Sequence, residues 1–307
     1  MPFRAASFAL ALSLVASYAH ATPSSLTSLA RRADRLKTDA GYVSPLDHGG
    51  KMLTFISITY PEGLGEPINA IISGNSDAAV LVDSAQNGGL RNYFLSVYMA
   101  GECLGQHLGG HQGANLGDGN GEKNETAVIR FDYYDPYLGT CQESIKGGNH
   151  LRYWTQDGPQ ANTGAVFMAC SVEKSADQYH DIIPDGYNLG RDWIVGNATA
   201  QASIPTPDLT AGATYVGSTS FGNYTYETTA TYVSGLLSNS SDGVNHLQTV
   251  PVNGRAAIDG LVAVLTVKIT GYPPGVKGPN GDARISKTWS PVVAAAALVL
   301  AAVLALW

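Results

Sequence analysis

The feature that most constrains this chain is an apolar segment at each terminus, because neither segment belongs in a globular core. The last sixteen residues, 292–307, read VVAAAALVLAAVLALW. A helix that spans a bilayer needs roughly 20 apolar residues and usually a basic flank, so this segment is too short. Small residues at 280–283 and a spacer to Pro291 precede it. This order predicts a glycolipid (GPI) anchor at Asn280, with 271–291 as the stalk and attachment region and 292–307 as a removed tail.

The N-terminal segment has the layout of a secretory signal peptide. Arg4 precedes an apolar stretch, and Ala19-His20-Ala21 is a small-x-small cleavage site. We therefore expect residues 1–21 to be removed. The polar segment 22–45 contains the dibasic pair Arg31-Arg32, where a secretory-pathway protease would release a pro-peptide ending at 32. An uncut, solvated pair is the alternative.

Together the two signals predict a protein that is secreted and GPI-anchored to the plasma membrane or cell wall. On the secretory route, each Asn-x-Ser/Thr motif becomes a candidate glycosylation site. The motifs begin at Asn124, Asn197, Asn223 and Asn239.

Composition argues against nucleic acid as a partner. Charged residues make up 14% of the chain and the formal net charge is −7, so a phosphate backbone would be repelled on balance. The 35 glycines and the polar content favour a loop-rich, glycosylated surface. Without the terminal signals about 250 residues are left, enough for one large domain, which we place at 46–270.

Three cysteines in an oxidising compartment predict one disulfide and one odd thiol. Cys170 lies in an alternating apolar stretch with Val166 and Met168, which indicates a buried thiol. Cys103 and Cys141 lie in glycine-rich surroundings and are therefore the predicted pair.

Periodicity along the chain predicts an α+β fold, a single domain with a mixed β-sheet and a few packed helices. Residues 101–122 are rich in glycine and read mostly as loop. We expect helices at 75–85, 90–99 and 188–200, and strands at 67–73, 126–133, 150–155, 164–172 and 261–269, the last being apolar enough to lie centrally in the sheet.

The first constellation of functional residues lies in the strand at 150–155. His150, Arg152, Trp154 and Gln156 alternate onto one face, which suits an anionic or carbohydrate ligand. A structural alternative has Trp154 packed in the interior and Arg152 paired with a carboxylate.

The second constellation lies at the start of the helix at 188–200. Asp185, Asn188, Arg191 and Asp192 stand close together there, shortly after His180. A capping role and an internal Arg191–Asp192 pair are the structural alternative.

A third, glycine-rich stretch holds His107 and His111, then Asp118 and the acidic or amide residues after it. Glycines between the histidines oppose a helical metal-binding pair, and the spacing after Asp118 does not fit an EF-hand. We expect an ordered polar turn, with no metal and no cofactor.

Several motifs together resemble the LssY C-terminal domain family. The resemblance covers about 46–270 in separated islands, and it is carried by EPINAIISG at 66–74, GNHLRYW at 148–154, TGAVFMACS at 163–171, His180 with Pro184-Asp185, GRDWIV at 190–195 and IDGLVAV at 258–264. It implies one α+β domain of the kind found in secreted fungal proteins. It singles out His150, Arg152, His180, Arg191 and Asp192, but implies no reaction.

These observations predict a GPI-anchored surface glycoprotein with a ligand-binding or wall-associated role. Arg152, Trp154, Asn188 and Arg191 are the candidate ligand-binding residues. The alternative is a surface hydrolase for a phosphoester or glycan, with His150 or His180 as general acid/base and Asp192 orienting a histidine. The hydrolase requires the catalytic candidates and the arginines to surround one concavity.

Overall fold

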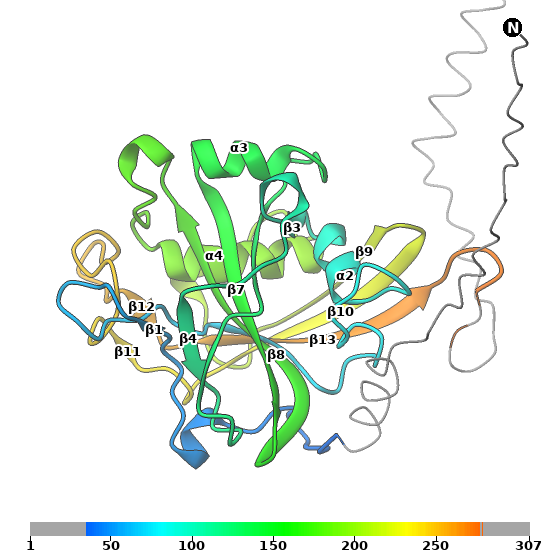
Figure 1. Ribbon diagram of the computed structural model, residues 1–307, viewed down its shortest axis with the longest axis horizontal. Coiled ribbons are helices and arrows are strands. Elements are labelled where there is room, and N and C mark those ends of the chain that lie inside the picture. Colours follow the sequence, from blue (N-terminus) through cyan, green and yellow to red (C-terminus); the bar gives the residue numbers. More distant parts are fainter. Residues whose placement is uncertain (1–34, 277, 279–307) are drawn as a thin grey trace, which may run out of the picture. The chain divides into compact units, whose positions relative to one another are not determined.

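The computed structural model describes residues 35–276 and 278 (Figure 1). The predicted signal peptide, the Arg31-Arg32 site, Asn280 and the apolar tail lie outside the described residues. Among the residues that are described, no helix has both the length and the apolar character needed to cross a membrane.

An eight-stranded mixed sheet organises the described part of the chain, in the order β3-β6-β7-β8-β2-β13-β10-β9 (Figure 1). Neighbouring strands are antiparallel except β13 and β2, which run parallel with Ala263 opposite Ala70. The strands are β2 (Ala70–Ile72), β3 (Met99–Gly101), β6 (Ala127–Phe131), β7 (Gly148–Gly158), β8 (Ala161–Glu173), β9 (Thr214–Phe221), β10 (Tyr224–Val233) and β13 (Val262–Gly271).

Three α-helices and two small sheets surround this sheet within the described residues. The helices are α2 (Leu90–Ser96), α3 (Gly139–Lys146) and α4 (Gly186–Ala198). One small sheet has the order β1-β4-β5 and the other pairs β11 with β12. Their strands are β1 (Phe55–Ile56), β4 (Gln112–Asn115), β5 (Glu122–Asn124), β11 (Asn239–Ser240) and β12 (Ile258–Asp259), and short 3-10 helices cover Pro45–His48 (η1), Cys103–Gly105 (η2), Ala176–Gln178 (η3) and Thr206–Asp208 (η4).

The two faces of the large sheet bury different cores because side chains alternate along each strand. Leu151 and Tyr153 of β7 pack with Phe94 of α2 and Ile194 of α4. Trp154, on the opposite face of the same strand, packs in a separate cluster that includes residues of β4. Helices α2 and α4 therefore cover one face, while β4 and nearby segments cover the other.

The predicted α+β class is confirmed, but two expected helices differ from the structure. Residues 75–85 form turns, because the Ser76 hydroxyl and the Asp77 carboxylate accept hydrogen bonds from the β13 backbone instead of capping a helix. The helix predicted at 90–99 ends at Ser96. Tyr98 then adopts a left-handed backbone (φ 62°) and the chain enters β3.

The cysteine predictions are confirmed. Cys103 of η2 is bonded to Cys141 of α3, across 38 residues of sequence. Cys170 is a free, buried thiol whose pKa is raised by burial. A buried thiol with a raised pKa is poorly reactive.

Candidate functional site

Strands β6, β7 and β8 bring polar residues together on the face opposite α2 and α4. Arg130 of β6 lies opposite His150 of β7, which lies opposite Ser171 of β8. Glutamates from four segments surround these strands. We call the resulting group the arginine–glutamate cluster, and it consists of Arg130, Arg152, His150, His180, Glu66, Glu102, Glu143 and Glu173.

Arg130 holds three of the four glutamates. Its Nη1 donates to Glu143 Oε2 at 2.9 Å and to Glu173 Oε2 at 3.2 Å, while Nε donates to Glu102 Oε1 at 3.3 Å. Glu102 and Glu143 lie beside the disulfide-bonded cysteines. The Cys103–Cys141 bond therefore keeps two of the acidic partners of Arg130 close to each other.

Arg152 holds the fourth glutamate and orients the imidazole of His150. Its Nη1 donates to Glu66 Oε2 at 3.3 Å and to His150 Nε2 at 2.9 Å. Because His150 Nε2 accepts this bond, the ring is neutral with its proton on Nδ1. Burial, followed by the charge of Arg152, lowers the pKa of His150 well below its usual value. The 3.4 Å contact between His150 and Glu173 is therefore not a pair of opposite charges.

Burial makes two of the glutamates weak acids. The Glu143 side chain is fully buried, and burial raises its pKa to about 7, with Arg130 opposing the shift and Glu173 reinforcing it. Burial likewise raises the pKa of Glu173, against the effect of Arg130. The Oε1 atom of Glu143 is buried without a hydrogen-bond partner. Near neutral pH the cluster thus contains a carboxyl that is poised to hold or lose a proton.

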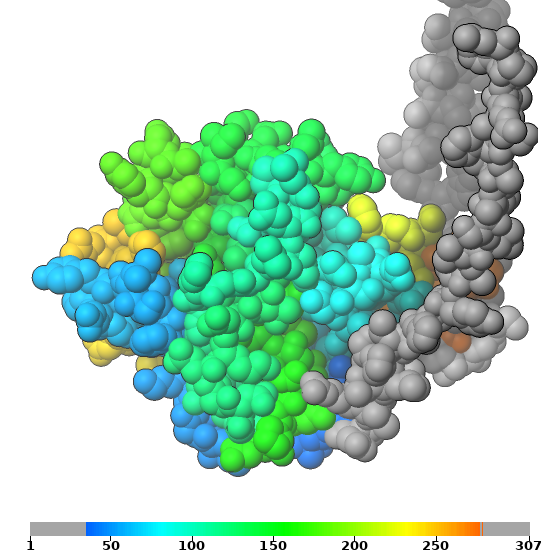
Figure 2. Space-filling model, in the orientation of Figure 1, coloured from blue at the N-terminus to red at the C-terminus, as the bar shows by residue number. Residues whose placement is uncertain are grey.

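An open pocket of about 690 Å³ gives solvent access to both arginines. Arg130, Arg152 and Glu102 lie in its wall, together with the apolar side chains of Ile58 and Leu108. Figure 2 shows two segments that supply the wall, near 56–58 in blue and near 102–112 in teal, on one face of the molecule. The pocket therefore combines charged hydrogen-bonding groups with apolar contacts, and we call it the arginine pocket.

His180 completes the cluster from the segment after η3. Its side chain is 37% exposed, and Nδ1 lies 3.4 Å from Glu173 Oε2. The structure therefore brings His150, Arg152 and His180 together around Glu173 and Glu66, as part of the sequence-based hypothesis requires.

Arg191 and Asp192 lie in a different network, so the expectation of one shared concavity is corrected. Arg191 is fully buried; it donates to both Asp192 oxygens at 2.7 and 3.0 Å and to both Asp259 oxygens at 2.7 and 2.8 Å. Tyr232 of β10 donates to Asp192 at 2.7 Å. Burial alone would lower the pKa of Arg191, but the hydrogen bonds to Asp259 and Asp192 outweigh this effect, and the pKa is raised. This network joins α4 to β10 and to the β12–β13 connection, which is a structural role.

The other candidate residues divide between the interior and the surface. Trp154 is 2% exposed and donates its indole N–H to the Lys123 carbonyl of β5, so its assignment to a ligand-binding face is corrected. Asn188 lines a second pocket of about 530 Å³ and donates to Asp185 at 2.7 Å. Asp185 makes no side-chain cap, because its backbone is left-handed and its carboxylate also binds Arg255.

The glycine-rich stretch, expected to be mostly loop, instead supplies β4 and the start of β5, which pair on either side of an ordered turn at Asp118. His107 is hydrogen-bonded to Asp83 and Tyr153 instead of pairing with His111 at a metal site. Asp118 accepts bonds from the Asn120 and Gly158 backbone, and so closes the turn against the β7–β8 hairpin.

Within the part of the chain that the structure describes, one set of side chains has the spacing of a metal site. Ligand atoms of Glu143, His150 and Glu173 lie within 4.8 Å of one another. However, Arg130 and Arg152 already donate to these groups, at 2.9 Å to Glu143 and to His150. Two guanidinium charges at hydrogen-bond distance oppose the binding of a divalent cation.

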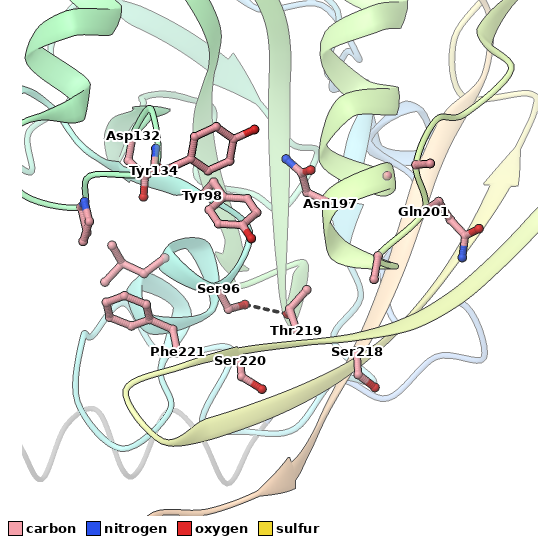
Figure 3. A pocket seen from close by; sticks show the side chains of 15 residues that line it. Ser96, Tyr98, Asp132, Tyr134, Asn197, Gln201, Ser218, Thr219, Ser220 and Phe221 are labelled. Carbon is pink, nitrogen blue, oxygen red and sulfur yellow. Dashed lines mark hydrogen bonds between the residues drawn. The ribbon is translucent and has the colours of Figure 1, made fainter. Parts of the chain in front are cut away.

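A further pocket, of about 640 Å³, was not anticipated from the sequence (Figure 3). We call it the tyrosine pocket, and its lining includes Tyr98, Tyr134, Asp132, Asn197, Gln201 and Ser218. Tyr98 and Tyr134 meet edge to face with ring centroids 4.9 Å apart. Both have left-handed backbones, with φ of 62° and 63°. Tyrosine rarely adopts this conformation, so the local sequence does not predict it.

Comparison with known proteins adds no relative. No family model, no curated protein and no solved structure matches this chain.

Proposed function

We propose that this protein is a GPI-anchored glycoprotein of the cell surface, built on an LssY-C-like domain, which binds a carbohydrate in the arginine pocket. The terminal signals support the location, and the disulfide is consistent with an oxidising compartment. The observation that carries the binding role is the access of Arg130 and Arg152, each fixed by carboxylates, to an open pocket.

Counting charges favours a neutral polyhydroxyl ligand over an anion. Four carboxylates face two guanidinium groups, so the cluster has an excess of acidic groups even when Glu143 holds a proton. A phosphate or carboxylate ligand would have to displace these glutamates from the arginines. Sugar hydroxyls can instead donate to the carboxylates and accept from the arginines at the same time. Ile58 and Leu108 suit the C–H face of a sugar ring.

A glycan array followed by titration calorimetry tests this function. Arg152→Ala should weaken binding by about tenfold to a hundredfold, since a hydrogen bond from a charged group contributes about 1.5–3 kcal/mol. Folding should persist, because Glu66 keeps its bond from Gln112. Arg255→Ala is the matched control, since Arg255 has one ion pair and lines the pocket beside Asn188. Equal affinity in the wild type and in Arg152→Ala would refute the assigned site.

A surface hydrolase is the second candidate, supported by the contact between His180 and Glu173. A partly exposed imidazole beside a carboxylate can serve as an acid/base group for a phosphoester or glycan substrate. The purified protein should be incubated with panels of both substrate classes. Turnover that is lost in His180→Asn but kept in His48→Asn, a change at an exposed histidine of η1, would favour the enzyme.

A further inference from the structure

The tyrosine pocket contains one of the four glycosylation motifs. Asn197 lies in the last turn of α4, and its motif is completed by Thr199, the C-cap residue of this helix. Figure 3 shows the Asn197 amide extending from α4 toward Tyr98 and Tyr134. Its only described hydrogen bond is a long one, from Nδ2 to the Val97 carbonyl at 3.5 Å. The nitrogen that would carry a sugar is therefore directed into a pocket and only weakly held.

Asn197 differs in this respect from the other motifs. Asn124, Asn223 and Asn239 are exposed, whereas Asn197 is partly buried. Asn223 lies at the turn between β9 and β10, where an attached glycan would extend into solvent.

Burial in the folded protein does not prevent modification, because oligosaccharide is transferred to a chain that has not yet folded. Transfer joins Asn197 Nδ2 to C1 of the first sugar, with loss of one amide proton and release of the lipid pyrophosphate carrier. When α4 then packs on the sheet, the first sugars have to lie in the space next to Nδ2. In this structure that space is the tyrosine pocket.

The pocket has the chemistry that an N-acetylglucosamine unit requires. Tyr98 and Tyr134 are 43% and 73% exposed, so ring surface is free to stack on the C–H face of a sugar. Gln201 and Ser218, which are both exposed, supply acceptors and donors for hydroxyl and acetamido groups. The left-handed backbones of both tyrosines turn the chain at this wall, and non-glycine residues in that conformation concentrate at ligand sites.

We infer that the N-glycan on Asn197 folds back into the tyrosine pocket and stacks on Tyr98 and Tyr134 as a part of the folded structure. This inference rests on the proposed passage through the secretory pathway. The attached glycan, and not a free saccharide, is the occupant, because its attachment atom already lies in the pocket wall.

The test uses the full chain, secreted from a eukaryotic host and treated with peptide N-glycosidase F with and without denaturation. Hydrolysis converts each released site from Asn to Asp, and peptide mass spectrometry reads this site by site. Under native conditions, release at Asn197 should be about tenfold or more slower than at Asn223, since sugar–aromatic contacts have to open before cleavage. After denaturation the two rates should agree.

Tyr134→Ala should remove the native protection at Asn197, whereas Tyr137→Ala should keep it, because Tyr137 is exposed and lies outside the pocket wall. If Tyr134→Ala does not fold, the release rates at Asn197 and Asn223 in native and denatured wild type still test the inference. The inference is overturned if Asn197 is unmodified while Asn223 carries a glycan, if both are released at one rate, or if Tyr134→Ala leaves protection unchanged. Absence of glycan at all four motifs would instead contradict the secretory location.

Discussion

Replacing Glu143 by Gln should remove a pH dependence from the stability of this protein. The pKa of Glu143 rises from 4.5 to about 7 on folding, chiefly through burial. The folded state therefore binds more protons at Glu143 than the unfolded state between these values, so the contribution of Glu143 to stability is greatest below pH 4.5 and is lost as pH rises through 7. At 1.36 kcal/mol per pH unit, the displacement corresponds to about 3 kcal/mol.

Urea unfolding at pH 4.5, 5.5, 6.5 and 7.5 measures this difference. From pH 4.5 to pH 7.5, the free energy of unfolding of the wild type should fall by about 3 kcal/mol relative to that of Glu143→Gln. The neutral amide keeps an acceptor for Arg130 and removes one buried carboxylate from a cluster that has an excess of them. Glu122→Gln, at an exposed position of β5, should keep the wild-type pH dependence. Parallel stability profiles for the wild type and Glu143→Gln would show that folding does not raise the pKa of Glu143.

Four further predictions concern the rest of the molecule. Arg191→Ala should destabilise the fold by about 3–5 kcal/mol in urea, because it leaves two carboxylates without their buried partner; an unchanged unfolding midpoint would instead support a ligand-binding role. Replacing Cys103 and Cys141 together by Ser should lower the free energy of unfolding by about 4 kcal/mol, given their separation of 38 residues, as measured by urea unfolding. Cys170 should react with a thiol reagent only after denaturation, and rapid labelling of the native protein would contradict its burial. Phosphatidylinositol-specific phospholipase C should release the protein from cells, and retention of Trp307 in the membrane-bound form would refute the anchor.

Local patterns were sufficient for the central strands but not for every helix. Alternation in β7 correctly separated His150 and Arg152 from Leu151 and Tyr153. The helix expected at 75–85 failed because its polar residues bind the β13 backbone, a contact between distant segments that no local period contains. Helix α3 was missed because its eight residues are mostly polar and the disulfide helps to hold it in place.

The candidate site was predictable only in part, for the same physical reason. His150 and Arg152 share one strand face, and that face is visible in the sequence. Glu66, Glu102 and Glu143 come from separate loops and a helix, so only the fold brings them to the arginines. Burial also decided which polar residues are structural: the Asp185-led helix looked functional, but it contributes Arg191 to an interior network.

The arrangement of the arginine pocket depends on the oxidation state of the disulfide between η2 and α3. Cys103 follows Glu102, and Cys141 lies two residues before Glu143, so the covalent bond tethers two acid-bearing arms on either side of one guanidinium group. A chain that has not been oxidised has the same charges but lacks the tether that keeps these arms opposed. Oxidation of the two cysteines thus completes the charge pattern of the pocket, and the reduced protein would have the same sheet around a less constrained site.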